Sequence, residues 1–317
     1  MTQRRDFLKT AGAVGSIGAL TGCLGIGGSQ PFNDGEIDMN ISPSVPTEDL
    51  QPQYGPIREY LKNEFDQTVK MNIANNYASV IEALGSGTTD VAETGPFAAA
   101  LGVNEGNAEV ILQRKGYGTW TYKSIIAVPN DSDIEEASDL EGKTVAFADP
   151  LSTSGALYPL YNISQAGVDI GNLPEGNGSQ AAFDAVFTGG HVSSYEQLAD
   201  GQVDAAGMGG FVRDTGAGPS TDEFKSTART LVESTGLPRA PIVVSPELSS
   251  DRKDALQEAF INAPDSIYYG QDGEEGTDDD LWFNDAREAG VDKYQSVIDV
   301  ATGLGVGAEI FESSSDS

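Results

Sequence analysis

Short apolar runs alternate with segments of helical spacing along most of the chain. Leu50, Tyr54, Ile57 and Leu61 recur at intervals of three and four residues, which predicts one buried face of a helix. Apolar runs bounded by Gly, Pro or Asp are typical of strands. The runs predict strands at 37–41, 69–73, 90–93, 109–113, 122–128, 144–147, 185–187, 203–206 and 241–244. Helical spacing or helix-start signals predict further helices at 77–84, from Gly95-Pro96 onward, and at 155–166, 195–198, 252–261 and 294–301.

This alternation favours an α/β fold with open, mostly parallel sheets covered by helices on both faces. Such sheets bind ligands beyond the carboxyl ends of their strands. The chain has 317 residues, which is long enough for two domains. Surface loops are expected at 171–182, 216–222 and 271–280, where Gly and polar residues gather.

The first residues predict an export signal rather than a part of the fold. Arg4-Arg5 ahead of Phe7-Leu8-Lys9 is typical of a twin-arginine signal, and Leu20-Thr21-Gly22-Cys23 of a lipobox. The apolar stretch between them is shorter than the roughly 20 residues that a membrane span needs. We therefore expect 1–22 to be a signal, Cys23 to be lipidated, and 23–35 to be a flexible tether on the outer face of the cytoplasmic membrane.

The net charge is −31, from 49 acidic and 18 basic residues, and loss of 1–22 would bring it to about −33. Because the acids are dispersed over a chain with 38% apolar residues, they indicate a solvated surface suited to high salt, as on a haloarchaeal cell. At about 1 M salt the screening length falls to roughly 3 Å, which silences self-repulsion. An acidic protein at ordinary salt is the alternative. Nucleic acid is not an expected partner, since its phosphates need Lys and Arg stripes.

Candidate chemistry gathers at Ser152-Thr153-Ser154-Gly155, between the predicted strand 144–147 and the helix 155–166. The first amides of a helix have no internal partner, and the positive end of the helix dipole favours an anion there. Ser and Thr are also common helix caps, so this stretch alone slightly favours a cap. His191, the only histidine, follows two glycines after the strand 185–187, where a small ligand can approach closely.

Eight segments in order along 37–260 carry a family resemblance. They are Asn75–Ile81, Asp90–Pro96, Tyr122–Val128, Asp139–Lys143, Asp149–Gly155, Phe187–His191, Gly201–Ala205 and Ala240–Val244. In these segments the chain resembles the phosphate-, phosphite- and phosphonate-binding proteins of ABC importers. The resemblance implies a two-lobed fold like that of type II periplasmic binding proteins. One lobe would comprise 36–125 and 241–317 and the other 126–240, joined by two hinge strands.

The resemblance also implies a function and a site. The chain would be a monomeric, extracytoplasmic receptor that binds phosphonate, phosphite or phosphate between its lobes, without metal or cofactor. Its partners would be a membrane permease and the ATPase of that permease. Uncharged donors would hold the anion, and the implied residues are Tyr77, Tyr122, Ser152, Thr153, Ser154 and His191.

Departures from the family pattern restrict which ligands the site is expected to bind. Family members that take aminoethylphosphonate carry acids that meet the amine, and the corresponding places here read Gly209-Gly210-Phe211 and Arg239-Ala240-Pro241. We therefore expect a ligand without an amine, with Asp214 left open as a substitute acid from a neighbouring turn.

Two other functions stay open. A receptor for a sulfonate, nitrate or a vitamin would share the architecture. An extracellular phosphoester hydrolase is disfavoured, because one histidine cannot build a cluster of His and Asp around a metal and no Gly-x-Ser-x-Gly motif occurs. We do not expect an enzyme.

Overall fold

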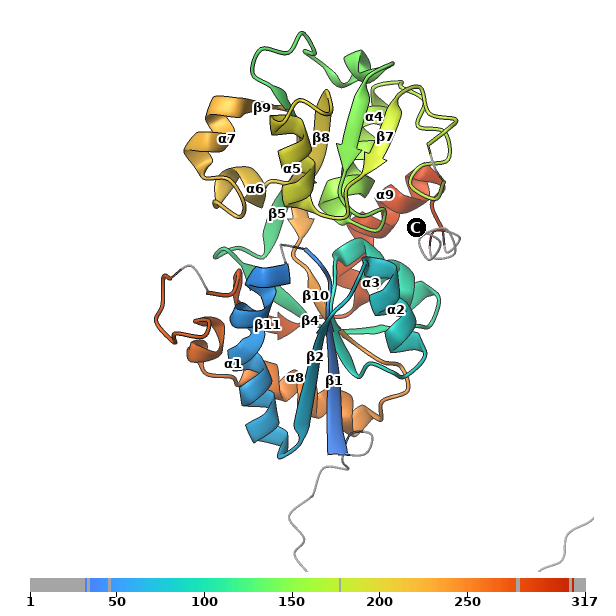
Figure 1. The fold of residues 1–317 in the computed structure, drawn as a ribbon. Coiled ribbons are helices and arrows are strands. Elements are labelled where there is room, and N and C mark those ends of the chain that lie inside the picture. Colours follow the sequence, from blue (N-terminus) through green and yellow to red (C-terminus); the bar gives the residue numbers. More distant parts are fainter. Residues whose placement is uncertain are drawn as a thin grey trace, which may run out of the picture.

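The computed structural model describes residues 32, 35–44, 47–176, 178–277, 280–307 and 310. They form two sheets, one above the other in Figure 1, and each sheet is flanked by helices. The predicted signal and Cys23 lie outside the described residues. Phe32 falls within the predicted tether, yet its ring is buried edge-on against Phe65, with the ring centroids 5.3 Å apart. At this residue the prediction of a free tether is therefore wrong.

The first sheet has the strand order β11-β4-β10-β3-β1-β2. Its parallel part pairs β1 (Glu36–Ile41) with β2 (Thr68–Ile73) and β3 (Val91–Glu93). Its antiparallel part contains β4 (Glu109–Gly116), β10 (Pro241–Val244) and β11 (Phe283–Glu288). The helices α1 (Thr47–Phe65) and α8 (Ser250–Ile261) cover one face, and α2 (Tyr77–Gly85) and α3 (Pro96–Asn104) cover the other.

The second sheet has the order β7-β6-β8-β5-β9. The strand β6 (Thr144–Phe147) is parallel to β7 (Asp184–Phe187) and β8 (Ala205–Gly209), whereas β5 (Thr121–Pro129) is antiparallel to β8 and β9 (Ala228–Pro238). The helix α4 (Tyr158–Gln165) covers one face. The other face is covered by α5 (His191–Ala199), α6 (Phe211–Asp214) and α7 (Thr221–Thr227). Shorter turns are the 3-10 segments Ala137–Leu140, Asp265–Tyr268 and Val291–Tyr294 and the π-helix Thr153–Leu157.

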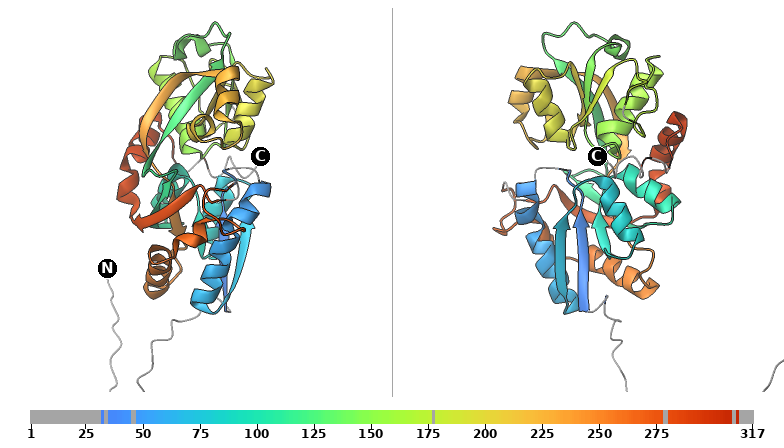
Figure 2. Two further views of the ribbon diagram at one scale, coloured as in Figure 1. Left: turned by 90° about the vertical axis from the view of Figure 1, so that its left-hand side faces the viewer. Right: turned by 45° about the vertical axis from the view of Figure 1, so that its right-hand side comes forward.

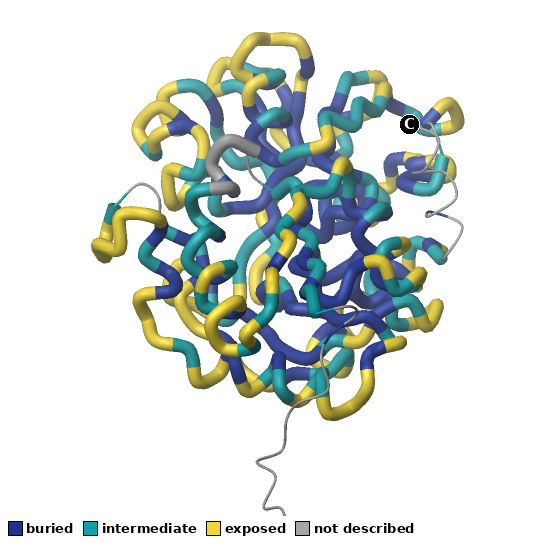
Figure 3. Tube along the Cα trace, turned by 60° about the horizontal axis from the view of Figure 1, so that its bottom comes forward, coloured by how far each residue is buried: buried dark blue, intermediate teal, exposed yellow. Residues whose placement is uncertain are grey.

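Both sheets are buried on both faces, and the side chains alternate as the strand period requires. In β5, Ile126 and Val128 pack toward α4, while Ile125 and Ala127 pack toward α5. Figure 3 shows this as buried backbone through the centre of the molecule and exposed backbone on the outer loops. No described helix is long and apolar enough to span a membrane.

The chain passes from the first sheet to the second between β4 and β5, and it returns between β9 and β10. The last helix, α9 (Gln295–Leu304), contacts both α3 and α4, and Figure 2 shows it beside the junction of the two parts. Two short connecting segments and one helix therefore join the two sheets.

The expected α/β architecture is present, but the sheets are mixed rather than mostly parallel. Among the described strands four pairs are parallel and five are antiparallel. The strands that flank the two crossings, β5, β9 and β10, account for most of the antiparallel pairs, because a chain that crosses and returns reverses its direction. Neither β9 nor β11 was predicted from the sequence.

Candidate functional site

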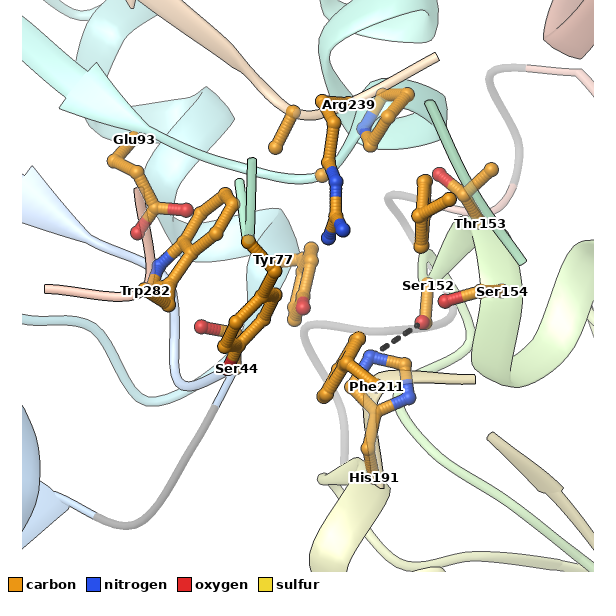
Figure 4. A pocket seen from close by; sticks show the side chains of 15 residues that line it. Ser44, Tyr77, Glu93, Ser152, Thr153, Ser154, His191, Phe211, Arg239 and Trp282 are labelled. Atoms are coloured by element: carbon orange, nitrogen blue, oxygen red, sulfur yellow. Dashed lines mark hydrogen bonds between the residues drawn. The ribbon is translucent and has the colours of Figure 1, made fainter. Parts of the chain in front are cut away.

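A cavity of about 60 Å³ lies between the two sheets and is lined by residues from both. This volume has room for a few water-sized groups and therefore suits a small ligand. Figure 4 shows the side chains that converge on it. All six binding residues implied by the sequence line this cavity. The full lining is Ser44, Tyr77, Glu93, Gly95, Pro96, Tyr117, Tyr122, Ser152, Thr153, Ser154, His191, Phe211, Arg239, Ala240 and Trp282.

The hydroxyl turn, Ser152–Ser154, forms one wall of the cavity. It opens a one-turn π-helix at Thr153 rather than the predicted helix from Gly155, and α4 continues from it. Ser152 caps this helix by accepting the Gly155 amide at 3.1 Å, and Thr153 Oγ1 accepts the Phe97 amide at 2.8 Å. Because a hydroxyl that accepts one bond keeps its own proton, both can still donate to a ligand.

His191 begins α5 and presents a neutral ring to the cavity. Its Nδ1 accepts the Gly209 amide at 3.0 Å, so this nitrogen carries no proton. Burial lowers the pKa of His191 to about 4. The single ring proton therefore sits on Nε2, which lies 3.4 Å from Ser152 Oγ at the cavity wall (Figure 4). A Cβ on Gly155 would lie 2.9 Å from the ring, so glycine is required for this approach.

The tautomer of His191 gives a direct test, because the chain contains no other histidine. We expect the imidazole signals in NMR spectra to stay constant from about pH 8 to pH 5 and to titrate near pH 4. The nitrogen shifts should identify Nε2 as the protonated nitrogen. An exposed ring would instead titrate near about pH 6.5, and that result would contradict the buried donor described here.

Two tyrosines supply phenolic donors. Tyr77 opens α2 and Tyr122 lies in β5, so they reach the cavity from different elements. Burial raises the pKa of both phenols, and both are therefore protonated at any physiological pH. Both phenols line the same cavity as the hydroxyl turn. A Cβ on Gly95 would lie 2.8 Å from the Tyr77 ring, which explains the glycine there.

Two hydrogen bonds link the helices of the first sheet to the loop after β6 of the second. Asp149 accepts the Tyr77 amide at 3.2 Å and the Leu151 amide at 2.7 Å. The Thr153–Phe97 bond joins the start of α3 to the same loop. Burial raises the pKa of Asp149 to about 6, with the two amides acting against this rise. Both sides of the cavity are thus connected through side chains next to the predicted binding residues.

The sequence did not indicate Arg239 as a binding residue. Because Arg239 lines the cavity, the lining does not consist of uncharged donors alone. Its guanidinium points into the cavity in Figure 4 and lies 5.2 Å from the ring centre of Tyr122. Ser44, after β1, is another missed donor: its buried hydroxyl has no partner in the described structure. Ser44 follows the predicted strand 37–41, so the strand-end rule applied to Ser152 could have found it. Arg239 follows β9, which the sequence did not predict.

The acidic side chains near the cavity are already bonded to other residues. Glu93 lines it, but its carboxylate is bonded to Arg114 and to the Tyr54 hydroxyl. Asp214, left open above as an amine-binding acid, is paired with Arg213 at 2.6 Å and does not line this cavity. The described lining thus offers no free carboxylate to a ligand amine. The described residues also hold no group of three or more His, Cys, Asp or Glu side chains placed to bind a metal ion.

Comparisons with known proteins show which proteins this chain resembles. The family model of the periplasmic substrate-binding proteins of phosphonate ABC transporters matches residues 39–294. The phosphate-import protein PhnD of Mycolicibacterium smegmatis is 35% identical over 184 residues, which are 56% of this chain and 55% of that protein. The phosphonates-binding periplasmic protein of Escherichia coli K12 is 27% identical over 251 residues, 75% of this chain and 68% of that one. The match thus spans only about half of the mycobacterial relative.

A solved structure shows the same fold. PhnD1 of Prochlorococcus marinus, in complex with methylphosphonate, superposes with a TM-score of 0.69 at 16% identity, covering 86% of this chain and 98% of that one. This likeness confirms the predicted two-lobed fold of type II periplasmic binding proteins.

Proposed function

Because the chain belongs to the periplasmic substrate-binding proteins of phosphonate ABC transporters, we propose that it is the receptor of an importer for a small phosphorus oxyanion. The anion would bind in the cavity between the two sheets. The proposed ligand groups are the hydroxyls of Ser152, Thr153 and Ser154, the His191 ring, and the phenols of Tyr77 and Tyr122.

The observation that carries this proposal is the convergence of donors with protons to give. Ser152 and Thr153 each accept one backbone amide and keep their own protons, His191 carries its proton on Nε2, and both phenols are held protonated by burial. A site that offers donors and no free carboxylate suits an anion with several oxygens.

The number of donors is sufficient for useful affinity. A hydrogen bond to a charged partner contributes about 1.5–3 kcal/mol. Five or six of them contribute about 7.5–18 kcal/mol in all. This range reaches the roughly 8 kcal/mol of a micromolar complex, and its upper part leaves a margin for ordering and desolvation. We therefore expect micromolar or tighter binding.

The ligand is proposed to lack an amine. The one lining acid, Glu93, is bonded to Arg114, and Asp214 is bonded to Arg213. Phosphate, phosphite and methylphosphonate are the remaining candidates of suitable size. Two related proteins, an importer component named for phosphate and a complex with methylphosphonate, handle ligands of this class.

The surroundings of the receptor are also proposals. Export by the twin-arginine route and a lipid on Cys23 would tether a folded monomer outside the cytoplasmic membrane, at a haloarchaeal surface. Closure of the lobe that contains β5 to β9 against the lobe that contains the other strands would create the surface read by a permease and its ATPase.

Calorimetric titration tests the function. The full chain with Cys23→Ser, which cannot be lipidated, would be titrated in high salt with phosphate, phosphite and methylphosphonate, with sulfate and nitrate as comparison anions. We expect saturable binding of at least one phosphorus oxyanion, and weaker binding of sulfate and nitrate. Binding of none of the three phosphorus ligands would remove the proposal, and tighter binding of sulfate or nitrate would move it to another receptor class.

A further inference from the structure

The cavity lining includes one buried cation, Arg239, whose guanidinium points into the cavity (Figure 4). This residue directly follows β9 and is only 6% exposed. Its guanidinium is surrounded by aromatic rings, with Cζ 5.2 Å from the Tyr122 centroid, 5.3 Å from Tyr117 and 6.0 Å from Trp282. Ring faces attract a cation and fix its plane, but they do not neutralise its charge.

No carboxylate of the described residues forms an ion pair with Arg239. Within the described structure the Arg239 guanidinium makes one long hydrogen bond, from Nη2 to Thr119 Oγ1 at 3.4 Å, and its buried Nε has no partner. Burial lowers the pKa of Arg239, whereas the carboxylates beside Arg213 raise the pKa of that guanidinium. A buried charge without a counter-ion is costly, and structures seldom keep one without an anion to meet it.

The acidic side chains near Arg239 are already paired with other residues. Glu93 lines the same cavity but is held by Arg114 and Tyr54. Asp214 lines the adjoining cavity, where it pairs with Arg213 at 2.6 Å and lies 4.0 Å from Lys123. The counter-charge of Arg239 must therefore enter with whatever fills the cavity.

We propose that Arg239 selects the ligand by charge: its guanidinium meets a second negative charge on the bound phosphorus oxyanion. That charge is either on a doubly ionised phosphoryl group or on a carboxylate of a short substituent. The same guanidinium repels an ammonium group, so aminoalkyl phosphonates are disfavoured. This inference rests on the proposed function and adds to it the charge of the substrate. Five N–H donors in one plane suit two anionic oxygens better than a lysine does.

The test compares three ligands of graded charge with the full-length Cys23→Ser protein. We expect methylphosphonate and phosphonoacetate to bind at least tenfold more tightly than 2-aminoethylphosphonate. Arg239→Gln should weaken the first two at least tenfold and change the third by less than threefold. Arg239→Lys should restore part of the loss. Tighter binding of phosphonoacetate than of methylphosphonate would assign the second charge to a carboxylate, and the reverse order would assign it to the phosphoryl group.

Arg287→Gln is the matched control. It also removes one positive charge from an arginine that lies over an aromatic ring, 4.2 Å from Trp120, but Arg287 does not line the cavity. We expect its affinities to equal those of the unsubstituted protein.

Equal losses of affinity for all three ligands in Arg239→Gln, or no loss, would overturn the charge selection while leaving the receptor function intact. So would equal affinity of the unsubstituted protein for methylphosphonate and 2-aminoethylphosphonate, a result that needs no variant. Absence of all binding would instead refute the proposed function.

Discussion

An Arg114→Met variant is expected to lose about 3–5 kcal/mol of its free energy of unfolding, because it leaves the Glu93 carboxylate buried without its cation. The Arg114 side chain is fully buried and the Glu93 side chain is 4% exposed. The guanidinium also bonds to Tyr54 and to the Ala240 carbonyl and lies 4.4 Å from the Trp282 ring centre. Methionine fills similar space but replaces none of these polar contacts.

Chemical denaturation at constant salt measures this loss, and a double variant identifies its cause. Adding Glu93→Gln to Arg114→Met removes the unpaired charge, so we expect the double variant to regain a substantial part of the lost stability. Arg213→Met is the matched control, since its partners Asp214 and Glu233 are partly exposed. Such pairs contribute about 1 kcal/mol or less. An equal loss in Arg213→Met and Arg114→Met would show that burial of the pair is unimportant.

Thr153→Val is expected to weaken binding of the preferred phosphorus oxyanion by about 10- to 100-fold, the equivalent of one hydrogen bond to a charged partner. Valine has nearly the shape of threonine but lacks the hydroxyl. The change also leaves the Phe97 amide, now 2.8 Å from Thr153 Oγ1, without its acceptor. Both losses act in the same direction, because the first weakens the ligand contact and the second weakens the link between the two sides of the cavity.

Thr153→Ser keeps the hydroxyl and serves as the control, with an affinity within about threefold of the original, since the charge-assisted bond survives. Calorimetry would give the affinities, and thermal unfolding without ligand would show whether Thr153→Val remains folded. If Thr153→Val bound as tightly as Thr153→Ser, the hydroxyl turn would not be a ligand contact.

Elements with a clear apolar period could be predicted from the sequence, and those without one could not. The helix that buries Leu50, Tyr54, Ile57 and Leu61 is present as α1. In β11 only Phe283 and Ala286 are buried, and the register shifts between them, so the strand shows no alternation. The edge strand β9 is mostly half-exposed or exposed and contains Gly236 at φ +77°, so its sequence resembles that of a loop.

The site was predictable where a local signal marks each residue. The hydroxyl turn and His191 stand at strand-to-helix junctions, so a strand-end rule and the family resemblance both point to them. Arg239 carries no such signal: it is a single basic residue between Pro238 and Ala240, and its importance comes from burial and from the absence of a described acid beside it. Contacts made by distant segments, such as Thr153 with Phe97, need the folded chain.

The links through Asp149 and Thr153 have a consequence for the release of cargo. If the two halves separate, the Tyr77 and Phe97 amides and the Asp149 carboxylate would exchange their protein partners for water, an exchange that is nearly balanced in free energy. Thr153 Oγ1 accepts the Phe97 amide with a lone pair, and its own proton remains available to the anion. Ligand binding and the link between the two halves therefore use different atoms of this hydroxyl group. If the chain is the proposed receptor, the free energies of its closed and open forms would therefore be similar, and contact with a transporter would need to supply little energy to release the ligand.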